Sequence, residues 1–302
     1  TFAGGLALKQ VLPRLLGQKP QVIAEMSFRT PLEKLLGKKL PPGNIEKVIW
    51  APKTGEKIMR FTRRIQRVIQ KGGELMNMIF YGPPGTGKTM TAKAVARASG
   101  AEYMIINGAA FEQLPPSKII MELEGVFRLA RTSKKPVLIF WDEADAALGK
   151  RGGEMESLAS RRLINTFLSN VSDTHNSKIM FILATNLPST LDDAVLSRFP
   201  QEGWIFFDRP ELAERAKILR MYLHDFLSAQ GLELGQDTDN EMTSFAEQLN
   251  TATGRDLRAL ARGVYDRMMD DDVASLNPAL VRKVINETQA NREQIGQYVY
   301  GQ

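Results

Sequence analysis

A glycine-rich segment of eight residues restricts the fold of this chain more than any other feature. It reads Gly-Pro-Pro-Gly-Thr-Gly-Lys-Thr over residues 82–89, between an apolar segment and a helical one, and fits the pattern G-x-x-x-x-G-K-[ST]. Glycines at these places let successive backbone N–H groups point at one anion, and the N-terminus of the following helix adds its partial positive charge. The segment therefore predicts a strand, a phosphate-binding loop and a helix in succession.

The loop and the first residues of the helix are the predicted contacts of a nucleotide. Lys88 is expected to reach the β- and γ-phosphates, and Thr89 to hold Mg²⁺ through its hydroxyl. ATP or ADP with Mg²⁺ is the expected ligand, and its predicted contacts here are Gly82, Pro83, Pro84, Gly85, Thr86, Gly87, Lys88, Thr89 and Met90.

Two further apolar segments end in polar residues that suit a bound triphosphate. Val137–Trp141 is followed by Asp142, which is expected to hold Mg²⁺ through water, and by Glu143, expected to act as general base on the attacking water. The apolar segment 182–184 leads to Asn186, whose amide would orient that water; a turn-forming role is the alternative. Polar residues at the end of a strand are a weak signal alone. They become a specific signal when the strand follows a phosphate loop in the sequence and belongs to the same sheet.

The order of apolar and helical segments predicts an α/β fold, a parallel sheet covered by helices on both faces, followed by a small all-helical part. The predicted strands are Met76–Tyr81, Tyr103–Ile106, Val137–Trp141, Ile179–Ala184 and Trp204–Phe207. No strand pattern follows them, and the predicted helices of that last part are 212–227, 241–249, 254–269 and 278–290.

These patterns divide the chain into a leader at 1–43, an α/β nucleotide-binding domain at 44–209 and a helical lid domain at 210–302. Residues 1–75 hold 15 Lys/Arg against 5 Asp/Glu, whereas the remaining residues hold 25 against 29. Anionic lipid, nucleic acid and an acidic neighbouring subunit are all compatible partners for so basic a start.

A basic amphipathic helix is predicted just before the phosphate loop. Ile58, Phe61, Ile65 and Val68 fall at helical spacing, and the basic residues lie elsewhere around the helix: Arg60, Arg63, Arg64, Arg67 and Lys71. Exposure of this helix face to solvent explains these arginines as well as binding of a ligand does. Because no aromatic residues interleave with the basic ones to form a stacking platform, binding to nucleic acid is not favoured.

Composition excludes several other kinds of chemistry. The chain has no cysteine and two histidines, which excludes disulfides, thiolate zinc sites and thiol catalysis and disfavours a histidine metal cluster. No apolar run reaches the roughly 18 residues that span a bilayer. Thr1 in place of Met indicates a fragment or processed form, and residues 2–8 are either the tail of an upstream membrane helix or the loose start of a soluble domain.

The three signals, in this order, resemble the AAA+ ATPase family. Residues 191–199 resemble the family segment that ends in arginine fingers; spastin- and katanin-like members have two adjacent arginines there, and this chain has a serine followed by Arg198. A finger acts on the neighbouring subunit's γ-phosphate, so the resemblance implies a ring, in this family a homo-hexamer. Residues 253–257 resemble the sensor-2 turn of the lid, with Gly254 beside the nucleotide and Arg255 sensing its phosphate in cis.

The same resemblance implies an adenine pocket and bears on substrate threading. Val48 and Ile49 would flank the adenine, and Ile218 and Tyr222 would close the pocket from the lid; all four are plain core residues under the alternative. Where many AAA unfoldases have an aromatic pore loop, this chain has Leu-Pro-Pro-Ser at 114–117. Threading of a polypeptide by aromatic side chains is therefore not expected, and Leu114 is the residue that could still grip one.

A narrower resemblance is to a mitochondrial inner-membrane subfamily of AAA proteins and its bacterial relatives, carried by short segments at 16–20, 28–30, 142–146, 150–151 and 220–222. It implies a mitochondrial inner membrane if the source is eukaryotic, a cytoplasmic or cytoplasmic-membrane setting if bacterial, and a leader at 1–43 that lies on anionic lipid or in the ring. The functional hypotheses are an ATP-driven remodeller, a nucleotide-gated membrane scaffold and a nucleic-acid-associated AAA protein. The sequence names no protein substrate.

Overall fold

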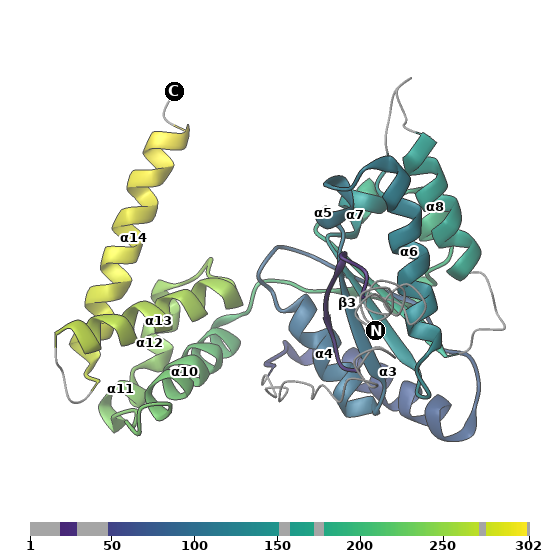
Figure 1. Ribbon diagram of the computed structural model, residues 1–302. Helices are drawn as coiled ribbons and strands as arrows, with labels where there is room; N and C mark the ends of the chain where they lie inside the picture. Colours follow the sequence, from purple (N-terminus) through teal and green to yellow (C-terminus); the bar gives the residue numbers. More distant parts are fainter. Residues whose placement is uncertain (1–18, 29–47, 151–157, 172–177, 272–275, 301–302) are drawn as a thin grey trace, which may run out of the picture. The chain divides into compact units, whose positions relative to one another are not determined.

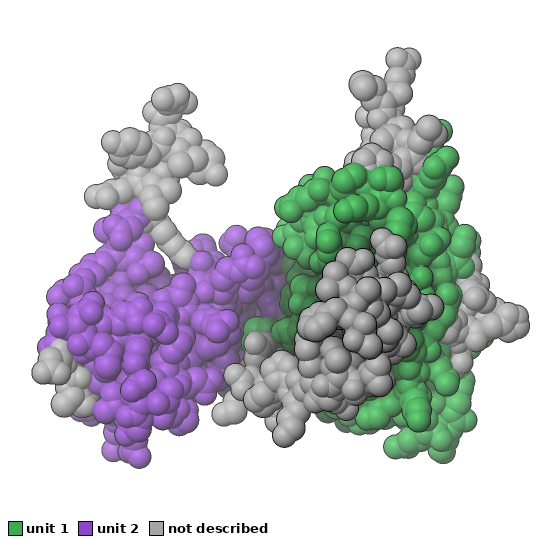
Figure 2. Space-filling model, viewed as in Figure 1, with its two compact units in different colours: residues 1–48, 54–82, 88–207 green, residues 49–53, 83–87, 208–302 purple. Residues whose placement is uncertain are grey.

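Two compact units make up the chain (Figure 2). The computed structural model describes residues 19–28, 48–150, 158–171, 178–271 and 276–300. The first unit, called the sheet unit below, consists of residues 1–48, 54–82 and 88–207. The second, the helical unit, consists of residues 49–53, 83–87 and 208–302. The division at 43 and 209 stays a prediction, and most of the predicted leader lies outside the described residues.

A six-stranded sheet forms the centre of the sheet unit, in the order β1-β3-β4-β5-β2-β6. All neighbouring strands are parallel except the pair β1 and β3. The strands are β1 (Ile23–Met26), β2 (Met78–Tyr81), β3 (Glu102–Asn107), β4 (Val137–Asp142), β5 (Ile179–Thr185) and β6 (Trp204–Phe206). The five predicted strands and the mostly parallel α/β fold are confirmed, and β1 is an addition that no sequence pattern predicted.

Helices cover both faces of this sheet, as the continuous apolar runs of its strands require. Figure 1 shows α3 and α4 on one side of the strands and α5 to α8 on the other. Trp141 of β4 stacks on Phe111 and meets Phe167 edge-on, at ring centroid distances of 5.2 and 5.4 Å. The helices are α3 (Pro52–Lys71), α4 (Lys88–Ser99), α5 (Ala109–Glu112), α6 (Pro116–Arg131), α7 (Ala144–Leu148), α8 (Leu158–Val171) and α9 (Asp193–Leu196), with short 3₁₀ turns at Pro188–Thr190 and Gln201–Gly203.

Strand β1 brings the described part of the leader into the sheet unit. It runs antiparallel to β3, with Ile23 opposite Ile106 and Met26 opposite Met104. Val22 and Phe28, just outside the strand, are 1% and 3% exposed and belong to the same apolar core as β3 and β4. Residues 19–28 are therefore an integral edge of this sheet.

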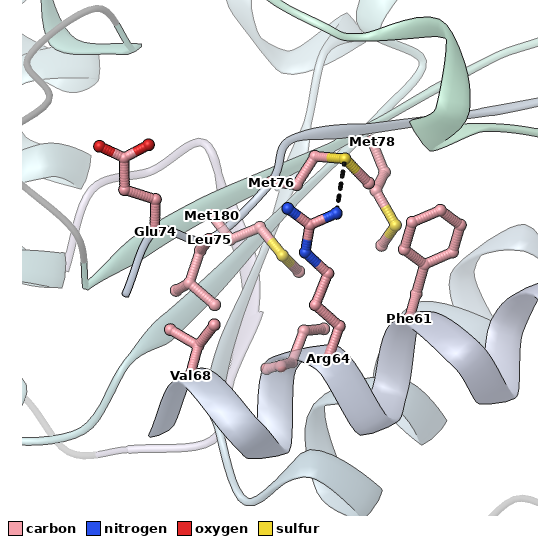
Figure 3. Close-up of a pocket in the computed structure, with 9 residues that line it drawn as sticks. Phe61, Arg64, Val68, Glu74, Leu75, Met76, Met78 and Met180 are labelled. Carbon is pink, nitrogen blue, oxygen red and sulfur yellow. Dashed lines mark hydrogen bonds between the residues drawn. The ribbon is translucent and has the colours of Figure 1, made fainter. Parts of the chain in front are cut away.

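The predicted basic helix is α3, and its apolar face is buried. Ile58, Phe61 and Ile65 are 5% exposed or less, whereas Arg60 and its neighbouring basic residues on the other face are exposed. Figure 3 shows the end of α3, where Nη1 of Arg64 donates a hydrogen bond to the sulfur of Met76 at 3.5 Å. The cavity lined by these residues measures about 10 Å³, room for a single water, so we read it as a packing gap and not as a ligand site.

The helical unit has a core of its own. Its helices are α10 (Leu212–Ser228), α11 (Gln236–Asn240), α12 (Met242–Gln248), α13 (Gly254–Asp270) and α14 (Pro278–Tyr300). Leu219, Phe245, Leu257 and Val281 are at most 1% exposed and join four of these helices. Asn277 caps α14, as its place before a proline indicated, by accepting a hydrogen bond from the backbone N–H of Leu280 at 2.9 Å. The four predicted helices are confirmed, and α11 is added to them.

Candidate nucleotide-binding site

The candidate site lies where three parallel strands of the sheet unit end together. β2 pairs with β5 and β5 with β4, so the carboxyl ends of all three meet at one edge. Gly82 follows β2, Asp142 ends β4, and Asn186 follows β5. In open α/β sheets this edge is where ligands bind. The fold thus brings together residues that lie up to about a hundred positions apart in the chain.

Lys88 is the first residue of α4 and turns back toward the end of β2. Its side chain is buried, with the residue 8% exposed, and Nζ donates to the backbone oxygen of Gly82 at 2.7 Å and to Oδ1 of Asn186 at 3.2 Å. Gly82 has a φ of 136°, and a Cβ there would lie 2.1 Å from the backbone oxygen of Phe207. Glycine is therefore required at this turn, which sets where Lys88 begins its helix.

Thr89 and Asp142 form the oxygen pair predicted for the metal. The Thr89 hydroxyl donates to Oδ2 of Asp142 at 2.7 Å, across 53 residues of sequence. A hydroxyl and a carboxylate are oxygen donors of the kind that Mg²⁺ takes, so this pair fits the ion.

Glu143 stands in an unusual backbone conformation directly after the metal-binding candidate. Among the residues that the structure describes, it is the one non-glycine residue with a positive φ, 50°. Such a conformation costs on the order of 1 kcal/mol or more and persists where its surroundings impose it. Its side chain is exposed and lines an open cleft, in keeping with a residue that acts on a ligand.

Gly108, directly after the neighbouring strand β3, supports this conformation. Its N–H donates to the backbone oxygen of Asp142 at 2.8 Å, and a Cβ on it would lie 2.1 Å from the backbone oxygen of Glu143. Its own φ and ψ, −61° and −40°, are open to any residue. The need for glycine at 108 is therefore one of space, and the sequence analysis did not find it.

An open cleft of about 350 Å³ lies beside the pair Thr89 and Asp142. The strands β1, β3 and β4 and the helix α4 supply its lining, which is Ala24, Glu25, Thr89, Lys93, Ile105, Ile106, Asn107, Asp142 and Glu143. Three of these were predicted from the sequence. Lys93 follows Thr89 by one helical turn, a spacing that could have indicated it, but nothing in the sequence pointed to Glu25.

Glu25, on the cleft wall, is held by two groups, Lys93 and Tyr103. Its Oε2 lies 2.7 Å from Nζ of Lys93, and its Oε1 accepts a hydrogen bond from the Tyr103 hydroxyl at 2.6 Å. Burial by itself would raise the pKa of Glu25, but the hydrogen bonds from Lys93 and Tyr103, with the positive charges of Lys93 and Arg97, outweigh it and leave that pKa below its usual value. Burial, and then the Glu25 carboxylate, raise the pKa of Tyr103.

Arg198, the predicted finger, follows α9 on the surface of the sheet unit. Its side chain is exposed, and within the described part of the chain no hydrogen bond or ion pair of its guanidinium is found. Phe199 beside it is 3% exposed and anchors the turn, with its backbone oxygen accepting a hydrogen bond from the Trp204 indole at 3.0 Å. The segment is thus fixed in place while its arginine faces solvent.

The helical unit contains the middle of the phosphate loop and the predicted sensor turn. The N–H of Arg255 donates to the backbone oxygen of Gly85 at 3.2 Å, and the Arg255 side chain is exposed. Thr253 and Asp256 form a reciprocal capping box at the start of α13, which fixes the turn containing Gly254. Pro83 accepts a hydrogen bond from the Thr86 hydroxyl at 2.9 Å, so the loop is also braced within itself.

The four residues assigned to adenine are divided between the two units. Ile218 is 8% exposed in the core of the helical unit, and Ile49 and Tyr222 pack against that core. The Tyr222 ring also lies under the Arg258 guanidinium at 5.9 Å. Val48 belongs to the sheet unit. Their role at adenine stays a prediction.

The predicted pore position is occupied by a residue that packs inward. Leu114 is partly buried and lies against the apolar core of the sheet unit. Pro115 and Ser117 are exposed. This packing weighs against Leu114 as a grip on a polypeptide, and the role left open for it stays a prediction.

Comparison with known proteins agrees with the fold and the strand-end residues. Residues 78–206 match the family described as "ATPase family associated with various cellular activities (AAA)", and the chain belongs to this family. It is 31% identical over 260 residues to "ATPase family AAA domain-containing protein 3" of Bos taurus, 31% over 258 residues to "ATPase family AAA domain-containing protein 3A" of Homo sapiens, and 29% over 283 residues to the Caenorhabditis elegans protein. The narrower resemblance pointed to this group.

The matched regions cover most of this chain but less than half of those relatives. They amount to 80%, 80% and 87% of this chain, and to 43%, 43% and 46% of the three proteins. Among the helices that the structure describes, none combines the length and the apolar character needed to cross a bilayer.

Proposed function

We propose that this chain hydrolyses ATP with Mg²⁺ at the ends of β2, β4 and β5. The observation that carries the proposal is the convergence there of a buried lysine, Lys88, with the oxygen pair of Thr89 and Asp142. Phosphoryl transfer needs little covalent chemistry from a protein. It needs positive charge at the phosphates, a held metal and an oriented water, and each of these has a candidate here.

Thr89 and Asp142 would hold Mg²⁺, which would neutralise charge that develops on the transferred phosphoryl group. Lys88 already donates to two oxygens, so its ammonium is oriented before a ligand arrives. Glu143 would accept the proton of the attacking water, and Asn186 would orient that water. By the family resemblance, Gly85 and Arg255 would also contact the phosphates.

We further propose that the active form is a ring, a homo-hexamer, in which Arg198 acts on the neighbouring subunit's nucleotide. The exposed guanidinium on a firmly packed turn supports this, because a finger must reach out of its own subunit. By the resemblance to the mitochondrial inner-membrane subfamily, the ring would be attached to that membrane or, in a bacterium, work in the cytoplasm or at the cytoplasmic membrane. Residues 1–43 would contact anionic lipid.

The test of hydrolysis is Glu143→Gln, which keeps the shape of the side chain and removes its basicity. We expect nucleotide binding to persist and phosphate release to fall by at least about 100-fold. Glu124→Gln, an exposed glutamate on α6, is the matched control and should keep full turnover. Normal phosphate release by pure Glu143→Gln protein would contradict the assignment.

A nucleotide-gated scaffold is the second candidate, and the inward packing of Leu114 favours it over a threading motor. In such a scaffold ATP orders the ring and slow hydrolysis resets it. Turnover measured with and without vesicles that contain anionic lipid, and with and without an unfolded protein, separates the two: a motor is stimulated and a scaffold is not. A nucleic-acid-associated role has no support in the described residues beyond their basic face on α3.

A further inference from the structure

Strand β1 places a carboxylate, Glu25, on the wall of the candidate site from a segment upstream of the phosphate loop. Glu25 and Lys93 line the same cleft as Thr89, Asp142 and Glu143. Lys93 lies one turn after Thr89 on α4, so both side chains leave the helix on one face. Among the described residues, the lining of the cleft thus includes one ammonium group and three carboxylates.

The ammonium of Lys93 therefore has a choice of partners. It pairs with Glu25 at 2.7 Å, and the second oxygen of Glu25 is engaged by the Tyr103 hydroxyl. The side chains of Lys93 and Glu25 are 18% and 43% exposed, so the pair is only partly screened by water. If Glu25 lost its charge, the carboxylates that remain in the described lining of the cleft would be those of Asp142 and Glu143.

An ammonium beside Asp142 would compete with a divalent cation for that carboxylate, because both are attracted to the same negative charge. Building on the proposed function, we propose that Glu25 is a positioning residue: it holds Lys93 at the β1 edge of the cleft and so leaves Asp142 free for Mg²⁺. The docking of β1 would then set how much Mg²⁺ the site requires.

The experiment compares the Mg²⁺ requirement of four proteins, the unaltered chain, Glu25→Gln, Lys93→Met and the double variant. For each, the rise in melting temperature caused by ATP and the rate of phosphate release are measured across a series of Mg²⁺ concentrations. We expect Glu25→Gln to need roughly five-fold more Mg²⁺ for half of either effect, the order expected for one partly exposed charge pair. At saturating Mg²⁺ its turnover should approach that of the unaltered chain.

Removing the competing ammonium should restore the site. The double variant Glu25→Gln/Lys93→Met is expected to return to the Mg²⁺ requirement of the unaltered chain, an outcome that simple loss of packing at β1 would not give. Glu122→Gln is the matched control, since Glu122 on α6 accepts a hydrogen bond from the N–H of Gln21 at 2.5 Å and so contacts the same leader segment outside the cleft. It should leave the Mg²⁺ requirement unchanged.

Three results would overturn the inference: an unchanged requirement in Glu25→Gln, a double variant as impaired as Glu25→Gln, or an equal effect of Glu122→Gln. Loss of ATP binding in Lys93→Met would also do so, because Lys93 would then be a ligand of the nucleotide. If the unaltered chain shows neither a Mg²⁺-dependent shift nor turnover, the proposed function is wrong and this inference with it. If the unaltered chain shows both the shift and turnover, the three results above contradict this inference alone and leave the proposed function standing.

Discussion

Helix α4 presents two lysines to the site, and their ammonium groups have different kinds of partner. Lys88, at its start, is buried and donates to two neutral oxygens, those of Gly82 and Asn186. Lys93, further along, is paired with the carboxylate of Glu25. Neutral oxygens satisfy the N–H groups of an ammonium without cancelling its charge, whereas a carboxylate does both. The hydrogen bonds of Lys88 to Gly82 and Asn186 thus orient its ammonium without neutralising it, whereas Glu25 neutralises the charge of Lys93.

Replacing each lysine by methionine gives the sharpest test of this contrast. Lys88→Met is expected to lower phosphate release by about 100-fold or more, since it removes charge at the developing phosphoryl group. Lys93→Met is expected to lower it by less than about three-fold, because that charge is already neutralised. The two rates are measured side by side on pure proteins at saturating Mg²⁺. Equal losses in both variants would end the distinction.

A smaller effect is expected from Gly108→Ala, which crowds the backbone of Glu143. The added methyl would lie 2.1 Å from the Glu143 backbone oxygen, so that residue must move. We expect about a ten-fold fall in kcat with little change in ATP affinity, together with about 1–3 kcal/mol lost in stability, the range for overpacking.

Gly263→Ala is the control for this substitution. Its new methyl would lie 3.6 Å from Val284 in an ordinary contact, inside helix α13, and should stabilise the chain by about 1 kcal/mol. A Gly108→Ala protein with lower ATP affinity and unchanged kcat would show that the strand end positions nucleotide and not the base.

The same contrast explains what the sequence could predict. At the centre of the sheet each residue sits beside a recognisable pattern: Lys88 in its glycine loop, Asp142 and Asn186 after apolar strands. Parallel strands bring their carboxyl ends to one edge, so the motifs alone were enough to place these residues together. The fold and this half of the site were therefore predictable from local signals and one topological rule.

The sequence contains no such pattern for β1, at the edge of the sheet. β1 is four residues long with a glutamate inside it, too short and too polar for a period to be recognised. The residues on either side of it, Val22 and Phe28, are buried in the core, which only the folded chain reveals. Gly108 was likewise hidden, because its backbone angles are ordinary and the demand for glycine comes from a strand remote in sequence.

A still smaller effect should follow from Tyr103→Phe, which tests how firmly the edge carboxylate is held. The ring stays and the hydroxyl that donates to Glu25 at 2.6 Å is lost. We expect about 1 kcal/mol less stability toward urea, the usual net value of one hydrogen bond, with turnover nearly unchanged. Tyr265→Phe, where the ring stacks on Phe226, is the control and should cost less. Equal costs would mean that the Glu25 hydrogen bond contributes little.

The smallest expected effect is a dependence of folding stability on pH that arises from Glu25. Because its pKa in the folded chain lies below the ordinary 4.5, the unfolded chain binds more protons there, and the ion pair stabilises the fold above that value. The stabilisation should fade as pH falls through the folded-state pKa. Tyr103, whose own pKa is raised, stays protonated over this range.

Urea unfolding of the unaltered chain and of Glu25→Gln from pH 7 down to pH 3 measures this contribution. We expect the difference in unfolding free energy to be about 0.5 kcal/mol at pH 7, after allowance for the exposure of the pair, and to approach zero at the acid end. Asp266→Asn, which opens the exposed ion pair with Arg262 in the helical unit, is the control and should show a smaller change. A difference that stays constant down to pH 3 would mean that Glu25 stabilises the fold through packing and not through its charge. The contrast drawn between Lys88 and Lys93 would then be wrong for Lys93.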